Sequence, residues 1–222
     1  MYTLEFFQGE LEAIYGVEAP RVRDYLMDRA QAEALFGPPP SPEALLVRES
    51  EGEIELGLFL DDEVVEAART ADPHDPRPLL TLPGALGPLA CAAEGVSHFV
   101  YLATRAARGR PVSLLELEVQ AEVDRFALLV LYLWRRGLRR LSPALRSTLF
   151  GRVRYRATLV EEELERYRLA NRLGGGYARF LEASYVRGAD AEGMLRELRQ
   201  SYRLGGGEKL GYLGARAGRH EA

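Results

Sequence analysis

Hydrophobic residues recur at helical spacing along most of the chain. The first such stretch runs from Leu4 to Ile14, where apolar residues three or four positions apart are typical of an amphipathic helix. A second stretch with the same spacing runs from Pro20 to Phe36 and predicts a second helix. The proline-rich segment at residues 37–42 ends that helix.

The hydrophobic period changes from helical to alternating between residues 44 and 60. A short apolar run, Leu45 to Arg48, precedes a turn candidate at residues 50–52, and alternate positions from Ile54 to Leu60 are then apolar. This pattern predicts a β-hairpin at about residues 44–60. A hairpin alone is only marginally stable in water, so we expect its apolar face to pack on helices.

The residues after Pro83 all have helical spacing. One continuous apolar stripe follows residues 86–108, and Ser113 with Glu116 predicts a capping box at the start of the next helix. We therefore expect a mainly α fold, a helical bundle with a small N-terminal α+β portion that contains one β-hairpin. The proline-rich segment at residues 72–78 predicts a division into residues 1–78 and 79–222, or one continuous domain.

Three consecutive glycines lie inside a long predicted helix, Leu159 to Val186. Each of Gly174–Gly176 costs about 1 kcal/mol relative to alanine in a helix interior. The sequence therefore predicts either a helix break or unusually tight packing at this point.

Composition excludes several classes of protein. Cys91 is the single cysteine, so no internal disulfide can form. The longest apolar run is too short for a membrane span, and no signal peptide is visible at the start. We expect a cytoplasmic protein without a membrane association. Basic residues are almost all arginine, which favours a bacterial source.

The predicted helix from Leu114 to Trp134 is apolar on two faces and is therefore expected to be central in its bundle. Glu122 interrupts the first face and Asp124 the second, while Glu118 borders the first. A buried carboxylate is costly unless it is protonated, paired, hydrogen-bonded or bound to a metal. We therefore predict that Glu122 and Asp124 have compensating partners.

A metal site is one way to compensate these carboxylates. Glu94 and His98 lie four residues apart in the preceding helix, and a short connector usually joins antiparallel neighbours. The set Glu94, His98, Glu118 and Glu122 is thus a candidate site for a divalent or transition metal. The competing interpretation needs no cofactor: Glu122 pairs with an arginine or tyrosine, and His98 is a surface residue paired with Glu94.

Charge is distributed unevenly along the chain. Residues 1–104 carry 19 acidic and 6 basic groups, whereas residues 105–156 carry 4 acidic groups and 12 arginines. The middle block offers candidate contacts for an anion or a partner: Arg135, Arg136, Arg139, Arg140, Arg152, Arg154 and Arg156. Arginines among aromatic residues can bind nucleic acid. They can equally complement helix dipoles and pair with the acidic first half.

No complete catalytic constellation is present in the sequence. There is no nucleophile elbow and no phosphate-binding loop, because both triple-glycine segments lack a preceding strand. We therefore expect a non-enzymatic protein-interaction or scaffold module, with a protein partner or a second copy of itself. The alternatives are a metal-dependent helical enzyme or metal-binding protein, and a nucleic-acid-binding protein that uses the arginine block.

Overall fold

The computed structural model describes residues 2–50, 53–70, 86–151, 153, 155, 157 and 159–218. Helices predominate, and a single small sheet accompanies them in the described ranges. The predicted fold class, mainly α with a small α+β portion and one hairpin, is confirmed. Within these ranges, no helix combines the length and the apolar character needed to cross a bilayer.

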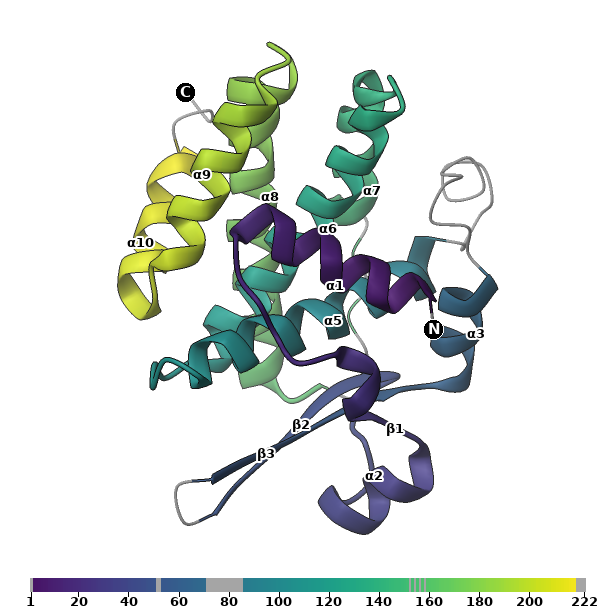
Figure 1. Cartoon of the computed structure of the whole chain (residues 1–222). Helices are drawn as coiled ribbons and strands as arrows, with labels where there is room; N and C mark the ends of the chain where they lie inside the picture. Colours follow the sequence, from purple (N-terminus) through teal and green to yellow (C-terminus); the bar gives the residue numbers. More distant parts are fainter. Residues whose placement is uncertain are drawn as a thin grey trace. The chain divides into compact units, whose positions relative to one another are not determined.

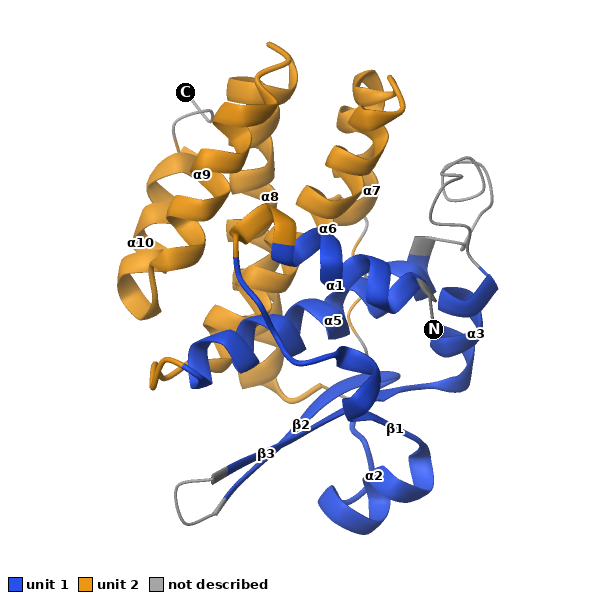
Figure 2. Ribbon diagram, viewed as in Figure 1, with its two compact units in different colours: residues 1–12, 17–107 blue, residues 13–16, 108–222 orange. Residues whose placement is uncertain are grey.

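The chain divides into two compact units (Figure 2). Unit 1 comprises residues Met1–Glu12 and Val17–Ala107, and unit 2 comprises Ala13–Gly16 and Arg108–Ala222. The boundary predicted at residues 78/79 lies outside the described residues. Helix α1 (Tyr2–Tyr15) contributes residues to both units.

Unit 1 contains the sheet, in the order β1-β3-β2 (Figure 1). Its elements after α1 are η1 (Val22–Tyr25), β1 (Leu26–Met27), α2 (Arg29–Phe36), β2 (Glu43–Ser50), β3 (Glu53–Leu60), α3 (Asp62–Thr70) and α5 (Leu86–Ala106). The antiparallel strands β2 and β3 are the predicted hairpin, with Leu45 opposite Leu58. Helix α5 packs on both of these strands, as expected for a hairpin that needs a helical cover.

The single helix predicted from Pro20 to Phe36 is wrong. The chain forms a 3-10 turn at η1, and Leu26 and Met27 then pair in parallel with Leu58 and Phe59 of β3. A new helix begins after Asp28, whose carboxylate accepts a hydrogen bond from Gln31 N at 2.8 Å. The helical spacing therefore runs through three separate elements, η1, β1 and α2, because a two-residue strand is too short to change the pattern.

Unit 2 is a bundle of helices around α6 (Leu114–Arg135). The other elements are η2 (Arg139–Leu141), α7 (Ser142–Phe150), α8 (Glu161–Leu181), the π-helical turn η3 (Glu182–Val186), α9 (Ala191–Arg203) and α10 (Gly206–Ala217). Helix α6 contacts α7, α8 and α10. Nearly all its residues from Val119 to Leu133 are buried, which explains why the sequence is apolar on two faces.

The predicted capping box at the start of α6 is only half formed. The Ser113 hydroxyl accepts a hydrogen bond from Glu116 N at 3.2 Å. The Glu116 carboxylate accepts instead from Gly206 N at 2.9 Å. An anionic oxygen at a helix N-terminus satisfies a free backbone donor, so Glu116 caps α10 rather than its own helix.

The three glycines of α8 do not break the helix but allow three other helices to approach it. A Cβ atom on Gly174 would lie 2.5 Å from Glu122 Cβ of α6, and one on Gly175 would lie 3.1 Å from Phe150 Cγ of α7. A Cβ atom on Gly176 would collide with Ala217 Cβ of α10. Of the two outcomes predicted from the sequence, tight packing is the one observed.

Replacing Gly176 by alanine should lower the free energy of unfolding by about 1–3 kcal/mol, although alanine is the better helix former. The added methyl group collides with Ala217 across the α8–α10 contact. Chemical denaturation measures the change. Gly211→Ala in α10 is the matched control, because a Cβ atom there meets nothing within 4 Å. It should stabilise the protein by up to about 1 kcal/mol, and equal effects would contradict the packing argument.

Candidate functional site

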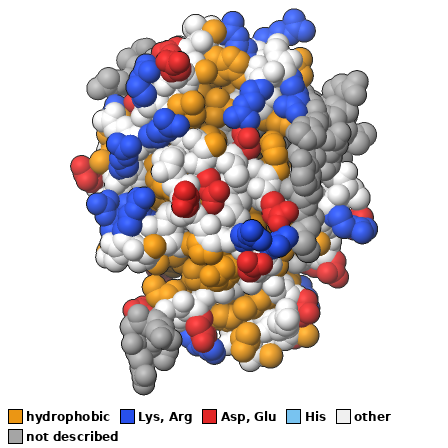
Figure 3. All heavy atoms as spheres, in the orientation of Figure 1, with side chains coloured by type: hydrophobic (Ala, Val, Ile, Leu, Met, Phe, Trp, Pro, Cys, Tyr) orange, Lys and Arg blue, Asp and Glu red, His pale blue; other side chains and the backbone are white. Residues whose placement is uncertain are grey.

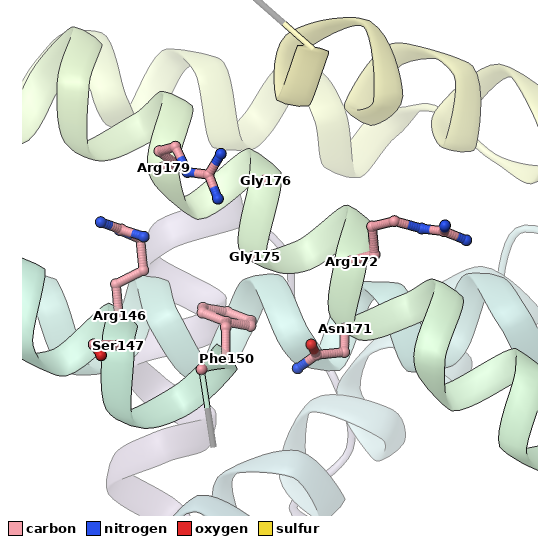
Figure 4. Close-up of a pocket in the computed structure, with 9 residues that line it drawn as sticks. Arg146, Ser147, Phe150, Asn171, Arg172, Gly175, Gly176 and Arg179 are labelled. Carbon is pink, nitrogen blue, oxygen red and sulfur yellow. The ribbon is translucent and has the colours of Figure 1, made fainter. Parts of the chain in front are cut away.

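A pocket with a volume of about 340 Å³ lies between α7 and α8 of unit 2 (Figure 4). Nine of the described residues line it: Arg146, Ser147, Phe150, Gly151, Asn171, Arg172, Gly175, Gly176 and Arg179. Three of them are arginines, and none carries a carboxylate. The lining is therefore strongly positive for its size.

Residue spacing on the two helices places these side chains on facing surfaces. Arg172 and Arg179 are seven residues apart on α8, two helical turns, so they share a face. Gly175 and Gly176 lie between them and carry no side chain, which leaves the middle of that face hollow. On α7, Arg146 and Phe150 are four residues apart and likewise share a face.

Arg146 is held in place by Glu182, the first residue of the π-helical turn η3. Arg146 Nε lies 2.8 Å from Glu182 Oε2, and Arg187 Nη2 lies 3.6 Å from Glu182 Oε1. The Glu182 side chain is 1% exposed, and a carboxylate so deeply buried requires cationic partners. The single carboxylate faces two guanidinium groups, so positive charge remains beside the pocket.

Polar groups other than arginine also line the pocket. Asn171 Nδ2 is buried and donates no hydrogen bond to any described residue. The Ser147 hydroxyl offers a further donor or acceptor. None of the nine described lining residues is a histidine, cysteine, lysine, aspartate or glutamate, so these nine supply neither a general base nor an activated nucleophile. Their side chains offer positive charge and hydrogen-bond donors to a ligand.

Asp124 lies in a second polar cluster of unit 2. Its side chain is 1% exposed, and its Oδ1 accepts a short hydrogen bond from the Tyr15 hydroxyl and one from Gln120 Nε2 at 2.6 Å. The buried amine of Lys209 donates to Gln120 Oε1 and lies 5.5 Å from the centre of the Tyr202 ring. The innermost helix therefore does hold a compensated carboxylate, but its partners are a phenol, an amide and, through the amide, an ammonium group.

Burial raises the pKa of several tyrosines in unit 2, among them Tyr15 and Tyr177. Burial raises the pKa of Tyr15 well above its ordinary value of 10.0, and the charge of Asp124 raises it further. Burial likewise raises the pKa of Tyr177, whose hydroxyl lies 3.0 Å from Glu197 Oε1. Both hydroxyls therefore remain protonated donors to a carboxylate well into the alkaline range.

The four residues of the predicted metal site are divided between the two units, two in each. Glu94 and His98 lie on α5 in unit 1, whereas Glu118 and Glu122 lie on α6 in unit 2. Within unit 2, the Glu122 carboxylate pairs with Arg125, the kind of partner that the cofactor-free interpretation requires. The metal site stays a prediction.

His98 is not the surface residue that the sequence suggests. Its side chain is 6% exposed, and Nδ1 lies 3.2 Å from Glu43 Oε1 of β2. A Cβ atom on Gly95 would lie 2.8 Å from Glu43 Cγ, so this glycine lets the strand approach α5 at that point. The partner 55 residues away in sequence is not one that helical spacing can identify.

Two arginines of the sequence-predicted block already have intramolecular roles. Arg136 stacks over the Tyr132 ring at 3.8 Å, and Arg139 Nη1 donates to the carbonyl oxygens of Val186 and Arg187 at 2.9 and 3.1 Å. The second contact complements the end of a helical segment, as the dipole interpretation requires.

The remaining arginines of the block divide into exposed residues and residues outside the described ranges. Arg135 and Arg140 are exposed, and Arg152, Arg154 and Arg156 lie outside the described residues. On the face of the molecule in Figure 3, Lys and Arg side chains stand apart, with Asp and Glu side chains among them. Nucleic-acid binding through this block stays a prediction.

The arginines of the pocket were not identified from the sequence. Their signal is the spacing Asn171-Arg172-x-x-Gly175-Gly176-x-x-Arg179, in which two small residues separate basic residues on one helix face. That spacing leaves a hollow on the helix face, but the hollow becomes a pocket only when a second helix packs against it. Helix α7 makes this contact.

Comparison of the chain with protein-family models, with curated proteins and with solved structures finds no match.

Proposed function

We propose that unit 2 is a non-enzymatic binding module that recognises an anionic group in the α7–α8 pocket. The observation that carries this proposal is the lining, whose nine described residues include three arginines and no carboxylate. An anion bound among these guanidinium groups gains favourable Coulomb energy from their positive charge. Arginine also presents a planar fork of donors that matches the oxygens of phosphate and carboxylate groups.

The proposal refines the expectation of an interaction module, because it names the chemistry of the contact. Glu182 supports it by fixing Arg146 at the pocket without entering the lining. A guanidinium group that is already oriented loses less conformational entropy on binding. The buried carboxylate thus acts as a support for an anion site.

Calorimetric titration of the purified full chain tests the proposal. The titrants are inorganic phosphate and benzoate, at low ionic strength. Arg179→Gln should weaken binding roughly tenfold, because it removes a charged donor from the site. Arg172→Gln should weaken binding by a smaller factor, because the exposed Arg172 contributes mainly long-range positive charge. Raising the salt concentration should weaken binding further, because it screens the charges.

Arg140→Gln is the matched control, an exposed arginine of the same unit that does not line the pocket. Circular dichroism establishes that all three variants remain folded. Absence of binding by either anion, or the same loss in the control as in the pocket variants, would refute the anion-binding function.

A further inference from the structure

The two ends of the α7–α8 pocket differ in chemistry. Arg146 and Arg179 lie at one end, Asn171 and Arg172 at the other, and Phe150 lies below Gly175 between them (Figure 4). A ligand that fills the pocket therefore meets two guanidinium groups, then an aromatic ring, then an amide donor. This order describes an elongated ligand rather than a small symmetric ion.

The charge at the Arg146–Arg179 end suits a doubly charged group. The carboxylate of Glu182 is shared between Arg146 and Arg187, so its single negative charge cannot offset both of those two guanidinium groups. A phosphomonoester carries about 1.5 to 2 negative charges at pH 7, whereas a carboxylate carries one. The larger charge offsets more of the positive potential of the lining.

The pocket is also too large for a phosphoryl group alone. Its volume is about 340 Å³, while a water molecule occupies about 30 Å³ of liquid. Pockets that bind organic ligands begin at about 300 Å³. The phosphoryl group would therefore fill a minor part, and the rest would be lined by the Phe150 ring and the amide of Asn171.

From these features, and resting on the anion-binding function proposed above, we infer that the ligand is an organic phosphomonoester. Its phosphoryl group is bound between Arg146 and Arg179, and its organic part lies against Phe150. Asn171 Nδ2, which has no acceptor among the described residues, donates to a polar atom of the organic part.

Calorimetric titration of the full chain with phenyl phosphate, inorganic phosphate and benzoate tests this inference. At pH 7.5, phenyl phosphate should bind roughly tenfold more tightly than either of the others, because it alone offers both the charge and an apolar surface. Lowering the pH to 5 should weaken phenyl phosphate several-fold, because its second pKa is about 6. Benzoate stays ionised over this range, and its affinity should change little.

Phe150→Leu tests the contribution of the organic part to the affinity separately from that of the phosphoryl group. The variant keeps apolar volume but loses the aromatic face, so it should remove most of the preference for phenyl phosphate and leave the affinity for inorganic phosphate within twofold. Phe36→Leu in α2 of unit 1 is the same substitution outside the pocket and should change neither affinity.

The possible outcomes distinguish a failure of this inference from a failure of the anion-binding function on which it rests. Equal affinities for phenyl phosphate and inorganic phosphate, tighter binding of benzoate, or an unchanged preference in Phe150→Leu would overturn the phosphomonoester while leaving anion binding intact. Failure of all three compounds to bind would overturn both.

Discussion

Asp124→Ala should lower the free energy of unfolding by about 2–5 kcal/mol, because it removes a buried acceptor that two donors share and leaves Gln120 Nε2 with only its 3.1 Å hydrogen bond to the Tyr15 hydroxyl. The Tyr15 hydroxyl and Gln120 Nε2 both donate to Asp124 Oδ1, and all three side chains are shielded from water. Truncation also leaves a cavity that the packed helix cannot close completely. Urea denaturation of the full chain measures the loss.

Asp124→Asn is the control for shape and hydrogen bonding. Asparagine keeps a carbonyl oxygen where Oδ1 lies, so this variant should lose no more than about 2 kcal/mol. Tyr15→Phe removes one of the two donors and should fall between wild type and Asp124→Ala. A loss below 1 kcal/mol in the alanine variant would show that the hydrogen bonds contribute little to stability.

Raising the pH from 10 to 11.5 should lower the free energy of unfolding by about 3 kcal/mol through Tyr15 and Tyr177 alone. In the unfolded chain both tyrosines lose their protons near pH 10. In the folded protein burial raises both pKa values, so both protons are retained. Above pH 10 the unfolded state therefore binds fewer protons than the folded state. The contribution of the two tyrosines to the free energy of unfolding is fully present below pH 10 and falls as the pH rises.

Phenylalanine substitutions assign the alkaline effect to particular residues. Above pH 10 the slope should be about 1.4 kcal/mol per pH unit for each tyrosine that stays protonated. Tyr177→Phe should therefore reduce the slope by that amount. Equal slopes in wild type and Tyr177→Phe would contradict the raised pKa. Denaturant titrations at several pH values provide the slopes.

Helical spacing was sufficient to predict most of the elements, because each helix buries one stripe or, for α6, two. The same spacing failed at β1, where Leu26 and Met27 pair with β3 through backbone groups that leave no periodic signal. It was ambiguous at Gly174–Gly176, because helix propensity alone favours a break at three glycines. Contacts with Glu122, Phe150 and Ala217 reverse that preference, and each comes from a distant part of the chain.

The polar sites were less predictable than the helices for a related reason. The position of Asp124 between apolar neighbours was enough to predict that it needs partners. Its partner Tyr15 is 109 residues away, and Lys209 is 89 residues from Gln120, so neither could be identified by periodicity. The arginine pocket depends in the same way on α7 facing α8. Sequence patterns identify which groups require compensation, and tertiary contacts determine which groups provide it.

The four residues Ala13–Gly16 determine where unit 2 can be cut from the chain. Tyr15 stacks on Tyr202 with ring centres 4.0 Å apart, and Arg199 donates to the carbonyl oxygens of Ala13 and Ile14 at 3.1 and 2.7 Å. A recombinant fragment that starts at Arg108 would expose the Tyr202 ring and lack the phenol bound to Asp124. A separately expressed unit 2 would need this short segment restored, either as an added peptide or by circular permutation.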